Sequence, residues 1–322
     1  MKRISIPLLI LLSLVTLCYG DTSLLNMQWD FVSWNPLLHE RLPKLIVLLC
    51  TGASLATAGM VMQSIFQNPL ASPSVLGINC GASFAVTLVF ILSLHNSYPY
   101  SIPLAAFVGS MATLFIVYAT ASAKGRGQMA PLILTGIAVS TLLLACTSAL
   151  TYAFRDHWQL MQTLTEWEAG STADRNWRHV HMQAPLALIG LLGCYRYREE
   201  INILALGDEQ AINLGVNVKQ ARWHLFLCVS LLTAGATAAV GNIAFFGLVL
   251  PHLLRKFFGP DHRTLIGQCI IIGSASLIGL DLILHTLKLQ IFSIGNVSSV
   301  LGGAFFLILL LNPFREGKYA YC

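Results

Sequence analysis

Charged residues are scarce in this chain. Asp, Glu, Lys and Arg make up 10% of its 322 residues, whereas hydrophobic residues make up 56% and the mean hydropathy is +0.70. A soluble domain carries about 25% charged residues. The composition therefore excludes a soluble globule and predicts an all-α polytopic membrane protein, whose few charged segments mark contacts with water, partners or cargo.

The sequence also lacks the familiar motifs of catalysis, nucleotide binding and metal binding. It has no Gly-x-x-x-x-Gly-Lys-Ser/Thr phosphate loop, no Gly-x-Ser-x-Gly nucleophile and no His-Glu-x-x-His pair. The eight cysteines are scattered, mostly through apolar stretches, and His179 and His181 are interpreted as solvated loop residues. We therefore expect a protein that is not an enzyme and that itself binds no metal or cofactor.

The net charge of +5 is explained by membrane topology without invoking nucleic acid. Cytoplasmic loops of membrane proteins are enriched in Lys and Arg. If the N-terminus is cytoplasmic, thirteen of the nineteen Lys and Arg residues fall on cytoplasmic segments. This asymmetry predicts that both termini are cytoplasmic.

Ten apolar stretches are candidates for membrane spans, each of which needs roughly 20 residues. They cover residues 4–19, 44–66, 77–94, 103–121, 130–153, 183–195, 223–241, 243–257, 265–287 and 292–312. The first has the layout of a secretory signal peptide, but Leu17 precedes Cys18 where a small residue is expected, and no Ala-x-Ala pattern precedes Asp21. We interpret it as an uncleaved first span.

Two segments rich in small residues suggest an internal repeat. Residues 52–59 lie in the second predicted span and residues 234–241 in the seventh, and these two spans cross the membrane in opposite directions. Small residues let helix backbones approach closely, and inverted repeats are common in transporters. An inverted repeat of spans 2–5 and 7–10 is one reading; the other is that small residues are simply frequent in membrane helices.

Two polar loops separate the spans. Residues 154–182 hold three tryptophans and are predicted to lie on the periplasmic side, whereas residues 196–222 are predicted to be cytoplasmic. Within the second loop, residues 204–216 predict a short amphipathic helix that has acids in its first turn and ends at Gly215. Such a helix is suited to a socket on a partner, and the alternative is a solvated connector.

A further charged segment follows the eighth predicted span. The span carries Pro251, then His252 and Arg255 on one helix face, and it breaks at Gly259. The turn that follows consists of Asp261, His262 and Arg263, and Asp261 is placed to cap the next helix. We predict a structural hinge at the inner mouth, without catalytic proton transfer.

Seven motifs, in this order, resemble those of FecCD-type permeases. They are Arg41-Leu-Pro-Lys44, Gly59-Met-Val-Met-Gln63, Asn68-Pro-Leu-Ala-Ser-Pro73 with its continuation to Gly81, Leu206-Gly-Asp-Glu-Gln-Ala-Ile-Asn-Leu-Gly215, Gly247-Leu-Val-Leu-Pro-His252-Leu-Leu-Arg255, Gly259-Pro-Asp-His-Arg263 and Leu301-Gly-Gly-Ala-Phe-Phe306. This family supplies the membrane subunits of ABC importers for ferric siderophores, haem and cobalamin, and the resemblance covers roughly residues 35–312.

The resemblance implies a bacterial inner-membrane subunit that works in an assembly. The implied partners are a second permease subunit, in a homodimer or heterodimer, two cytoplasmic ATPase subunits that hold ATP and Mg, and a periplasmic binding protein. Residues 1–322 would then form a single permease domain with a cytoplasmic coupling loop over 196–222. The coupling contacts implied are Leu206, Gly207, Asp208, Glu209, Ala211 and Gly215.

The resemblance also implies residues that receive the binding protein. Arg41 and Lys44 match the basic positions that face glutamates of that protein. The ammonium of Lys44 is a single point charge, whereas an Arg at this position would donate two parallel hydrogen bonds to a carboxylate. A third arginine of the family is replaced by His285, with Lys288 nearby. Asp281 matches an aspartate of the family, for which we favour a helix-packing role over proton coupling.

Two pairs of residues match the inner constriction of the family. Asn68 and Leu70 match a loop that narrows the pathway, and Met129 and Ala130 replace hydroxyl residues of a second constriction. An apolar constriction at these positions can still close the pathway by excluding water. Ferric siderophore is the expected cargo, with haem and cobalamin as alternatives. An ion-coupled secondary transporter is the rival class, although Asp281 stands nearly alone as an intramembrane charge.

Overall fold

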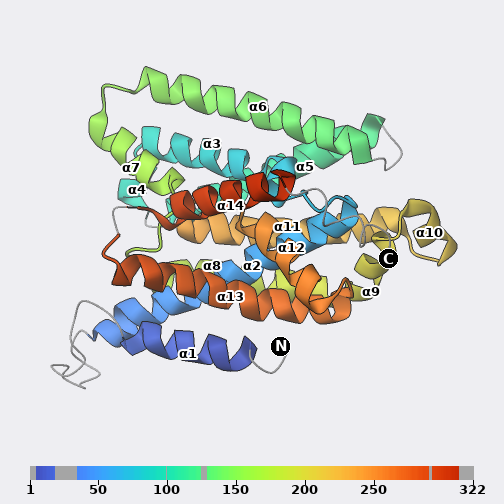
Figure 1. Ribbon diagram of the computed structural model, residues 1–322. Helices are drawn as coiled ribbons and strands as arrows, with labels where there is room; N and C mark the ends of the chain where they lie inside the picture. The colour runs from blue at the N-terminus through green and yellow to red at the C-terminus, as the bar shows by residue number, and fades with distance from the viewer. Residues whose placement is uncertain (1–4, 19–34, 99, 125–128, 290–291, 312–322) are drawn as a thin grey trace.

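The computed structural model describes residues 5–18, 35–98, 100–124, 129–289 and 292–311, and every regular element in these ranges is helical, which confirms the all-α class (Figure 1). The helices are α1 (Ser5–Cys18), α2 (Leu42–Ile65), α3 (Ile78–Ile91), α4 (Leu94–Ser97), α5 (Ser101–Lys124), α6 (Met129–Ala153), α7 (Trp158–Glu168), α8 (Trp177–Arg196), α9 (Arg198–Leu204), α10 (Asp208–Asn213), α11 (Val218–Val240), α12 (Phe246–Phe258), α13 (His262–Thr286) and α14 (Ile294–Leu311), with short helical turns η2 (Leu37–Arg41) and η3 (Pro73–Leu76).

Five of the described helices are long and apolar enough to cross a membrane. They are Leu37–Ile65, Ser101–Ala121, Ala130–Ala153, Val218–Val240 and His262–Thr286, and three shorter apolar helices are Ser5–Cys18, Ile78–Ile91 and Ile294–Ile308. The two other predicted spans, 183–195 and 243–257, fall on α8 and α12. Each predicted span thus coincides with a helix, and the total of ten crossings stays a prediction.

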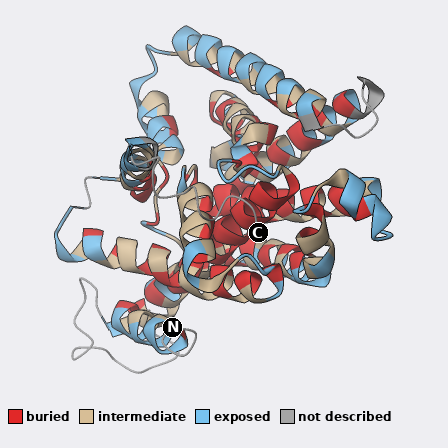
Figure 2. Ribbon diagram, turned by 45° about the vertical axis from the view of Figure 1, so that its right-hand side comes forward, coloured by how far each residue is buried: buried red, intermediate tan, exposed pale blue. Residues whose placement is uncertain are grey.

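Helix α2 lies at the centre of the bundle, and its residues from Thr51 to Ile65 are all buried (Figure 2). Its glycines meet glycines of two other helices. A Cβ atom added at Gly59 would overlap the Gly247 carbonyl of α12, and one added at Gly52 would overlap the Gly273 carbonyl of α13. The small residues noted in the sequence therefore allow backbone-to-backbone packing around α2.

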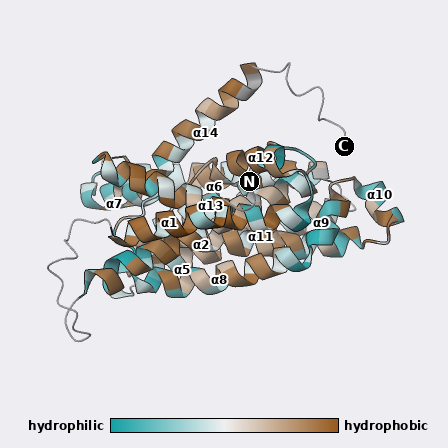
Figure 3. Ribbon diagram, turned by 60° about the horizontal axis from the view of Figure 1, so that its bottom comes forward, coloured by the Kyte–Doolittle hydropathy of each residue, from teal (hydrophilic) through white to brown (hydrophobic). Residues whose placement is uncertain are grey.

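The polar residues gather at the two ends of the bundle (Figure 3). One end carries α7 and the start of α2, and the other carries α9 and α10 (Figure 1). The first end matches the predicted periplasmic loop 154–182 and the second the predicted coupling loop 196–222. We call them the outer and inner ends.

The helix lengths support the predicted inverted repeat. Helices α2, α3, α5 and α6 have 24, 14, 24 and 25 residues, and α11, α12, α13 and α14 have 23, 13, 25 and 18. The second helix is short in both halves. Helix α2 starts at the outer end, whereas α11 runs toward that end, and its Val240 carbonyl accepts a hydrogen bond from the Ser171 N–H of the outer loop at 2.9 Å.

We predict that Gly59→Ala prevents the native packing of α2 on α12, because the new methyl group meets a backbone carbonyl that cannot rotate away. The cost should reach or exceed the roughly 1–3 kcal/mol of ordinary overpacking. Gly267→Ala in α13 is the matched control, since no atom lies within 4 Å of its added Cβ. Thermal unfolding in detergent, followed by size-exclusion chromatography, measures both variants. Equal stability of the two would contradict this packing.

Candidate functional site

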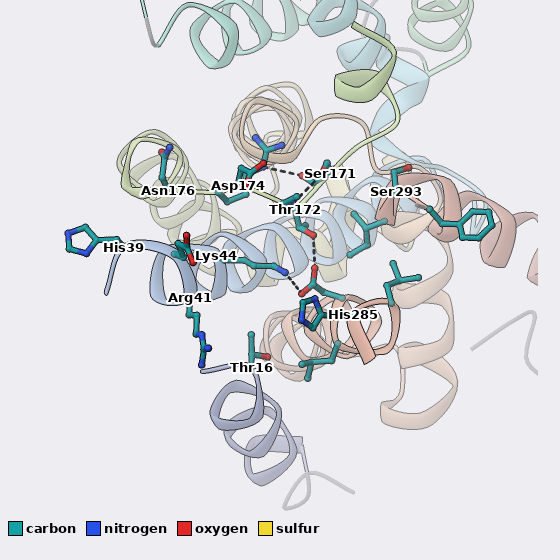
Figure 4. A pocket seen from close by; sticks show the side chains of 18 residues that line it. Thr16, His39, Arg41, Lys44, Ser171, Thr172, Asp174, Asn176, His285 and Ser293 are labelled. Carbon is teal, nitrogen blue, oxygen red and sulfur yellow. Dashed lines mark hydrogen bonds and ion pairs between the residues drawn. The ribbon is translucent and has the colours of Figure 1, made fainter. Parts of the chain in front are cut away.

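A cavity of about 560 Å³ opens at the outer end between η2, α2, the 171–176 loop and α13 (Figure 4). Its lining includes three of the four residues predicted to receive a binding protein, Arg41, Lys44 and His285. The fourth, Lys288, is exposed just after α13 with a left-handed backbone (φ 54°). The sequence prediction thus selected residues that the fold does bring together.

An ion pair forms the floor of this cavity. The Lys44 ammonium lies 2.8 Å from Asp281 Oδ2, and the Thr172 hydroxyl donates to Asp281 Oδ1 at 2.5 Å. The Asp281 side chain is only 8% exposed, so its charge depends on these partners. The expectation that Asp281 stands nearly alone was therefore wrong. The sequence does not reveal its partner, because α2, which carries Lys44, starts more than 230 residues earlier in the chain. The contact joins α2, α13 and the outer loop, in agreement with a helix-packing role.

Arg41 does not lie on the outer surface as an exposed docking charge. It is 7% exposed, and its guanidinium donates to the carbonyls of Leu17 and Cys18 at 2.9 and 3.2 Å. These are among the last carbonyls of α1, which a cation at a helix C-terminus stabilises. Lys44, by contrast, is 26% exposed in its side chain, and both Lys44 and His285 line the cavity.

His179 is not a freely solvated loop residue. It completes a capping box at the start of α8 with Asn176, and its Nε2 lies 3.0 Å from Arg175 Nη1. Burial and then the charges of Arg175 and Arg178 lower the pKa of His179 to about 4, and burial lowers the pKa of Arg175 to about 10. The imidazole is thus neutral near pH 7 and accepts from the guanidinium, which holds the outer loop on α8.

At the inner end, the predicted helix over 204–216 is confirmed as a shorter helix, α10 (Asp208–Asn213), with Asp208 and Glu209 in its first turn. Helix α9 ends at Leu204, Gly207 takes φ 113°, and α10 begins at Asp208. The predicted stop at Gly215 is confirmed by its φ of 82°, with the Val216 N–H bonded to the Ala211 carbonyl at 3.0 Å. A left-handed glycine at both positions turns α10 away from the bundle.

We call residues 204–216 the coupling segment, after its predicted role. One face of this segment is held to the bundle and the other is exposed. Ala211 is buried, and Asp208 pairs with the buried Arg222 of α11. Glu209 is exposed, as are the large apolar side chains Leu206, Ile212 and Leu214. Apolar side chains exposed together beside an acid are typical of a contact surface for a partner.

The predicted gate loop touches the same segment. Asn68 and Leu70 are exposed in the turn after α2, where Asn68 Oδ1 accepts from the Leu70 N–H at 2.9 Å. The neighbouring Gln67 donates to the Leu204 carbonyl of α9 at 3.3 Å. Ala130 is exposed at the start of α6, and the side chain of Met129 is outside the described part of the chain.

The 251–263 motif forms a hydrogen-bonded junction at the inner end. Asp261 caps α13 through the Arg263 N–H at 3.0 Å, as predicted, and hydrogen bonds from Asn202 and then from that N–H lower its pKa. The buried His262 lies 2.5 Å from the Ser64 hydroxyl of α2 and 2.6 Å from Asn202 Oδ1 of α9. The junction therefore ties α2, α9 and α13 together.

His252 and Arg255, which were predicted to share a helix face, contact different helices. His252 packs against Phe305 of α14 with ring centroids 6.0 Å apart, whereas Arg255 donates to the Ser64 hydroxyl at 3.1 Å. Pro251 is buried, and Gly259 ends α12 with φ 86°. Sequence reasoning missed Asn202 and Ser64. Both are ordinary polar residues within helices, and only the long-range fold gives them partners.

We predict that Lys44→Met lowers the stability of the protein, because it leaves the Asp281 carboxylate buried without its counter-ion. The loss should be smaller than the roughly 3–5 kcal/mol of a fully buried pair, since Lys44 is partly exposed. Lys44→Met combined with Asp281→Asn should recover most of the loss, because a neutral amide still accepts from Thr172. Thermal unfolding of the two single variants and of the double variant tests this, and simple additivity of the two substitutions would contradict the ion pair.

Comparison with known proteins identifies the fold. The model of the FecCD transport family matches residues 8–312. The chain is 36% identical to the hemin transport system permease protein HmuU of Yersinia pestis, over 96% of this chain and 94% of that protein. It is 35% identical to the cobalamin import system permease protein BtuC of Halobacterium salinarum, over 84% and 72% of the two chains, and 35% identical to the Fe(3+) dicitrate transport system permease protein FecD of Escherichia coli, over 92% and 97%.

A solved structure agrees. The chain superposes with a TM-score of 0.86 and 27% identity on a metal-chelate type ABC transporter in an inward-facing conformation, covering 97% of this chain and 99% of that one. The family match covers both ends of the bundle and all the residues discussed above. The chain is therefore a membrane-spanning ABC permease that belongs to the FecCD transport family.

Proposed function

We propose that this chain is the permease subunit of an importer that carries a ferric siderophore across the bacterial inner membrane, driven by separate ATPase subunits. The observation that carries the proposal is the coupling segment at the inner end. It exposes Leu206, Glu209, Ile212 and Leu214, while Asp208 and Arg222 fix its other face to α11. A segment that is fixed to α11 on one face and exposes apolar and acidic side chains on the other is suited to contact an ATPase subunit.

The energy source lies on that partner. The chain has no phosphate-binding loop in its sequence, so ATP and Mg would be held by the ATPase subunits, and this subunit has no nucleotide-binding role of its own. Two permease subunits, identical or different, would enclose the pathway. In this arrangement both termini are cytoplasmic, and the 154–182 loop faces the periplasm.

A periplasmic binding protein would dock over the outer cavity. His285 and the exposed Lys288 would supply basic groups for acidic side chains of that protein, beside the partly exposed Lys44 that pairs with Asp281, and Arg41 fixes the end of α1 behind them. Exposed charge pairs contribute only about 0.2–1 kcal/mol each. Several weak contacts let the binding protein leave after delivery.

The cargo is inferred from the relatives. Those named for hemin, cobalamin and Fe(3+) dicitrate carry metal complexes, and a charge-poor interior suits a large chelate that must not stick. Ferric siderophore is the proposed cargo, and haem and cobalamin are the alternatives. The Lys44–Asp281 pair is a feature that suits an ion-coupled transporter, but the two charges neutralise each other and lie near one end of the bundle.

Reconstitution in proteoliposomes with candidate ATPase subunits and a chelate-loaded binding protein tests the proposal. Uptake of ferric chelate should require ATP and both partners, and it should persist when ion gradients are collapsed. Uptake that follows an ion gradient without ATP would overturn the proposal. Uptake of hemin or cobalamin alone would retain the importer and replace the cargo.

Within this system we predict that Glu209→Arg reduces uptake at least about tenfold and reduces co-purification of the ATPase subunits, because it reverses the charge of the exposed coupling face. Lys219→Glu is the matched control, since Lys219 is an exposed charge of the same loop that lies beyond Gly215. The control should retain both properties. Normal uptake and normal co-purification in Glu209→Arg would remove this segment from the ATPase contact.

A further inference from the structure

The two short helices of the repeat are each preceded by a non-helical connection. Residues 66–77 lead into α3, with only a short turn at η3, and residues 241–245 lead into α12. In transporters built from inverted repeats, interrupted segments at corresponding positions of the two halves mark the place where cargo passes. The two connections are therefore the first place to look for cargo contacts.

The start of α3 lies near the middle of the bundle rather than at its inner end. A Cβ atom added at Gly77 would contact Ser140 of α6, and Ser140 is the twelfth of the 25 residues of that helix. Asn79 follows two residues later, in the first turn of α3. Its amide is thus placed at a depth where lipid would surround any exposed side chain.

An amide pair joins the first turn of α3 to the connection that precedes α12. Asn79 Nδ2 donates to Asn242 Oδ1 at 2.9 Å, and both residues are half-buried. Asn242 lies in the bend after α11, where a Cβ atom added at Gly295 of α14 would overlap its carbonyl. A partly exposed amide pair and a non-helical backbone are tolerated at membrane depth only when they face protein or a water-filled path.

Building on the proposed function, we infer that the Asn79–Asn242 pair lines the translocation path and is a transient hydrogen-bonding site for the oxygen-rich face of a ferric chelate. The pair keeps an amide oxygen and amide hydrogens beyond those used in its own hydrogen bond. Because both side chains are neutral, they can hydrogen-bond a passing chelate without holding it as a fixed charge would. Weak binding of this kind allows release toward the inner end.

Thiol accessibility tests the inference in the assembled transporter. Asn79→Cys and Asn242→Cys are made separately in a background whose eight native cysteines are replaced, and a charged methanethiosulfonate reagent is applied. Charged reagents need water and a thiolate, so both positions should be labelled. Leu188→Cys is the control, because Leu188 is an apolar residue in the middle of α8 with 60% exposure and faces the surface of the bundle. It should stay unlabelled.

Protection of the two thiols by cargo then distinguishes a cargo-binding site from a site that is only accessible to water. Ferric citrate, a ferric trihydroxamate and hemin are supplied in turn on a loaded binding protein, and at least one should slow labelling of both positions severalfold. Labelling that all three leave unchanged, or an absence of labelling, would overturn the inference. Failure of the proposed function is distinguishable, because it would appear as a lack of ATP-dependent uptake in the unsubstituted protein.

A structural role for the pair predicts a different result in a second variant. Asn79→Leu combined with Asn242→Leu replaces the hydrogen bond by an apolar contact of similar size, which a membrane interior accepts. We expect uptake to fall at least tenfold, while stimulation of ATP hydrolysis by the binding protein is retained. Normal uptake in this double variant would show that the amides only hold α3 and α11 together, and it would overturn the cargo site.

Discussion

The close contact of α2 with α13 is the constraint on which both ends of this protein depend. At its middle, Gly52 and Gly273 leave no space for a Cβ atom, and the Ser274 hydroxyl donates to the Leu49 carbonyl at 2.8 Å. Without a hydrophobic drive between helices in lipid, association relies on such van der Waals contact and hydrogen bonds between helices. The two helices therefore behave as one unit.

The same two helices are joined at both ends by polar contacts. Lys44 pairs with Asp281 at the outer end, and Ser64 bonds His262 at the inner end. Lys44 and Ser64 are separated by about 30 Å along a straight helix, at roughly 1.5 Å per residue, which is the thickness of the hydrocarbon core. The outer contact also holds Thr172 of the outer loop, and the inner contact also holds Asn202 of α9. A rigid unit thus connects the outer cavity to the coupling segment at the inner end.

Local patterns predicted much of the fold. The apolar stretches, the cap at Asp261 and the stop at Gly215 depend on residues close in sequence, and the structure has them where they were predicted. The contacts that join distant helices were not predictable. The burial of Arg41 against α1, the Lys44–Asp281 pair and the bonds of Asn202 need partners that lie between 23 and 237 residues away. The start of α10 was predicted a few residues too early, because local sequence does not show that residues 205–207 leave the helix before Asp208.

Coupling between the two faces through α2 and α13 is measured most directly by a double-mutant cycle. The outer substitution is Lys44→Met, the inner substitution is Asn202→Ala, and the readout is the stimulation of ATP hydrolysis by the binding protein in proteoliposomes. Independent sites this far apart add within about 0.3–0.5 kcal/mol. A rigid connection predicts an interaction free energy clearly above that limit, since either substitution already interrupts the same unit. Additive effects of the outer and inner substitutions would contradict it.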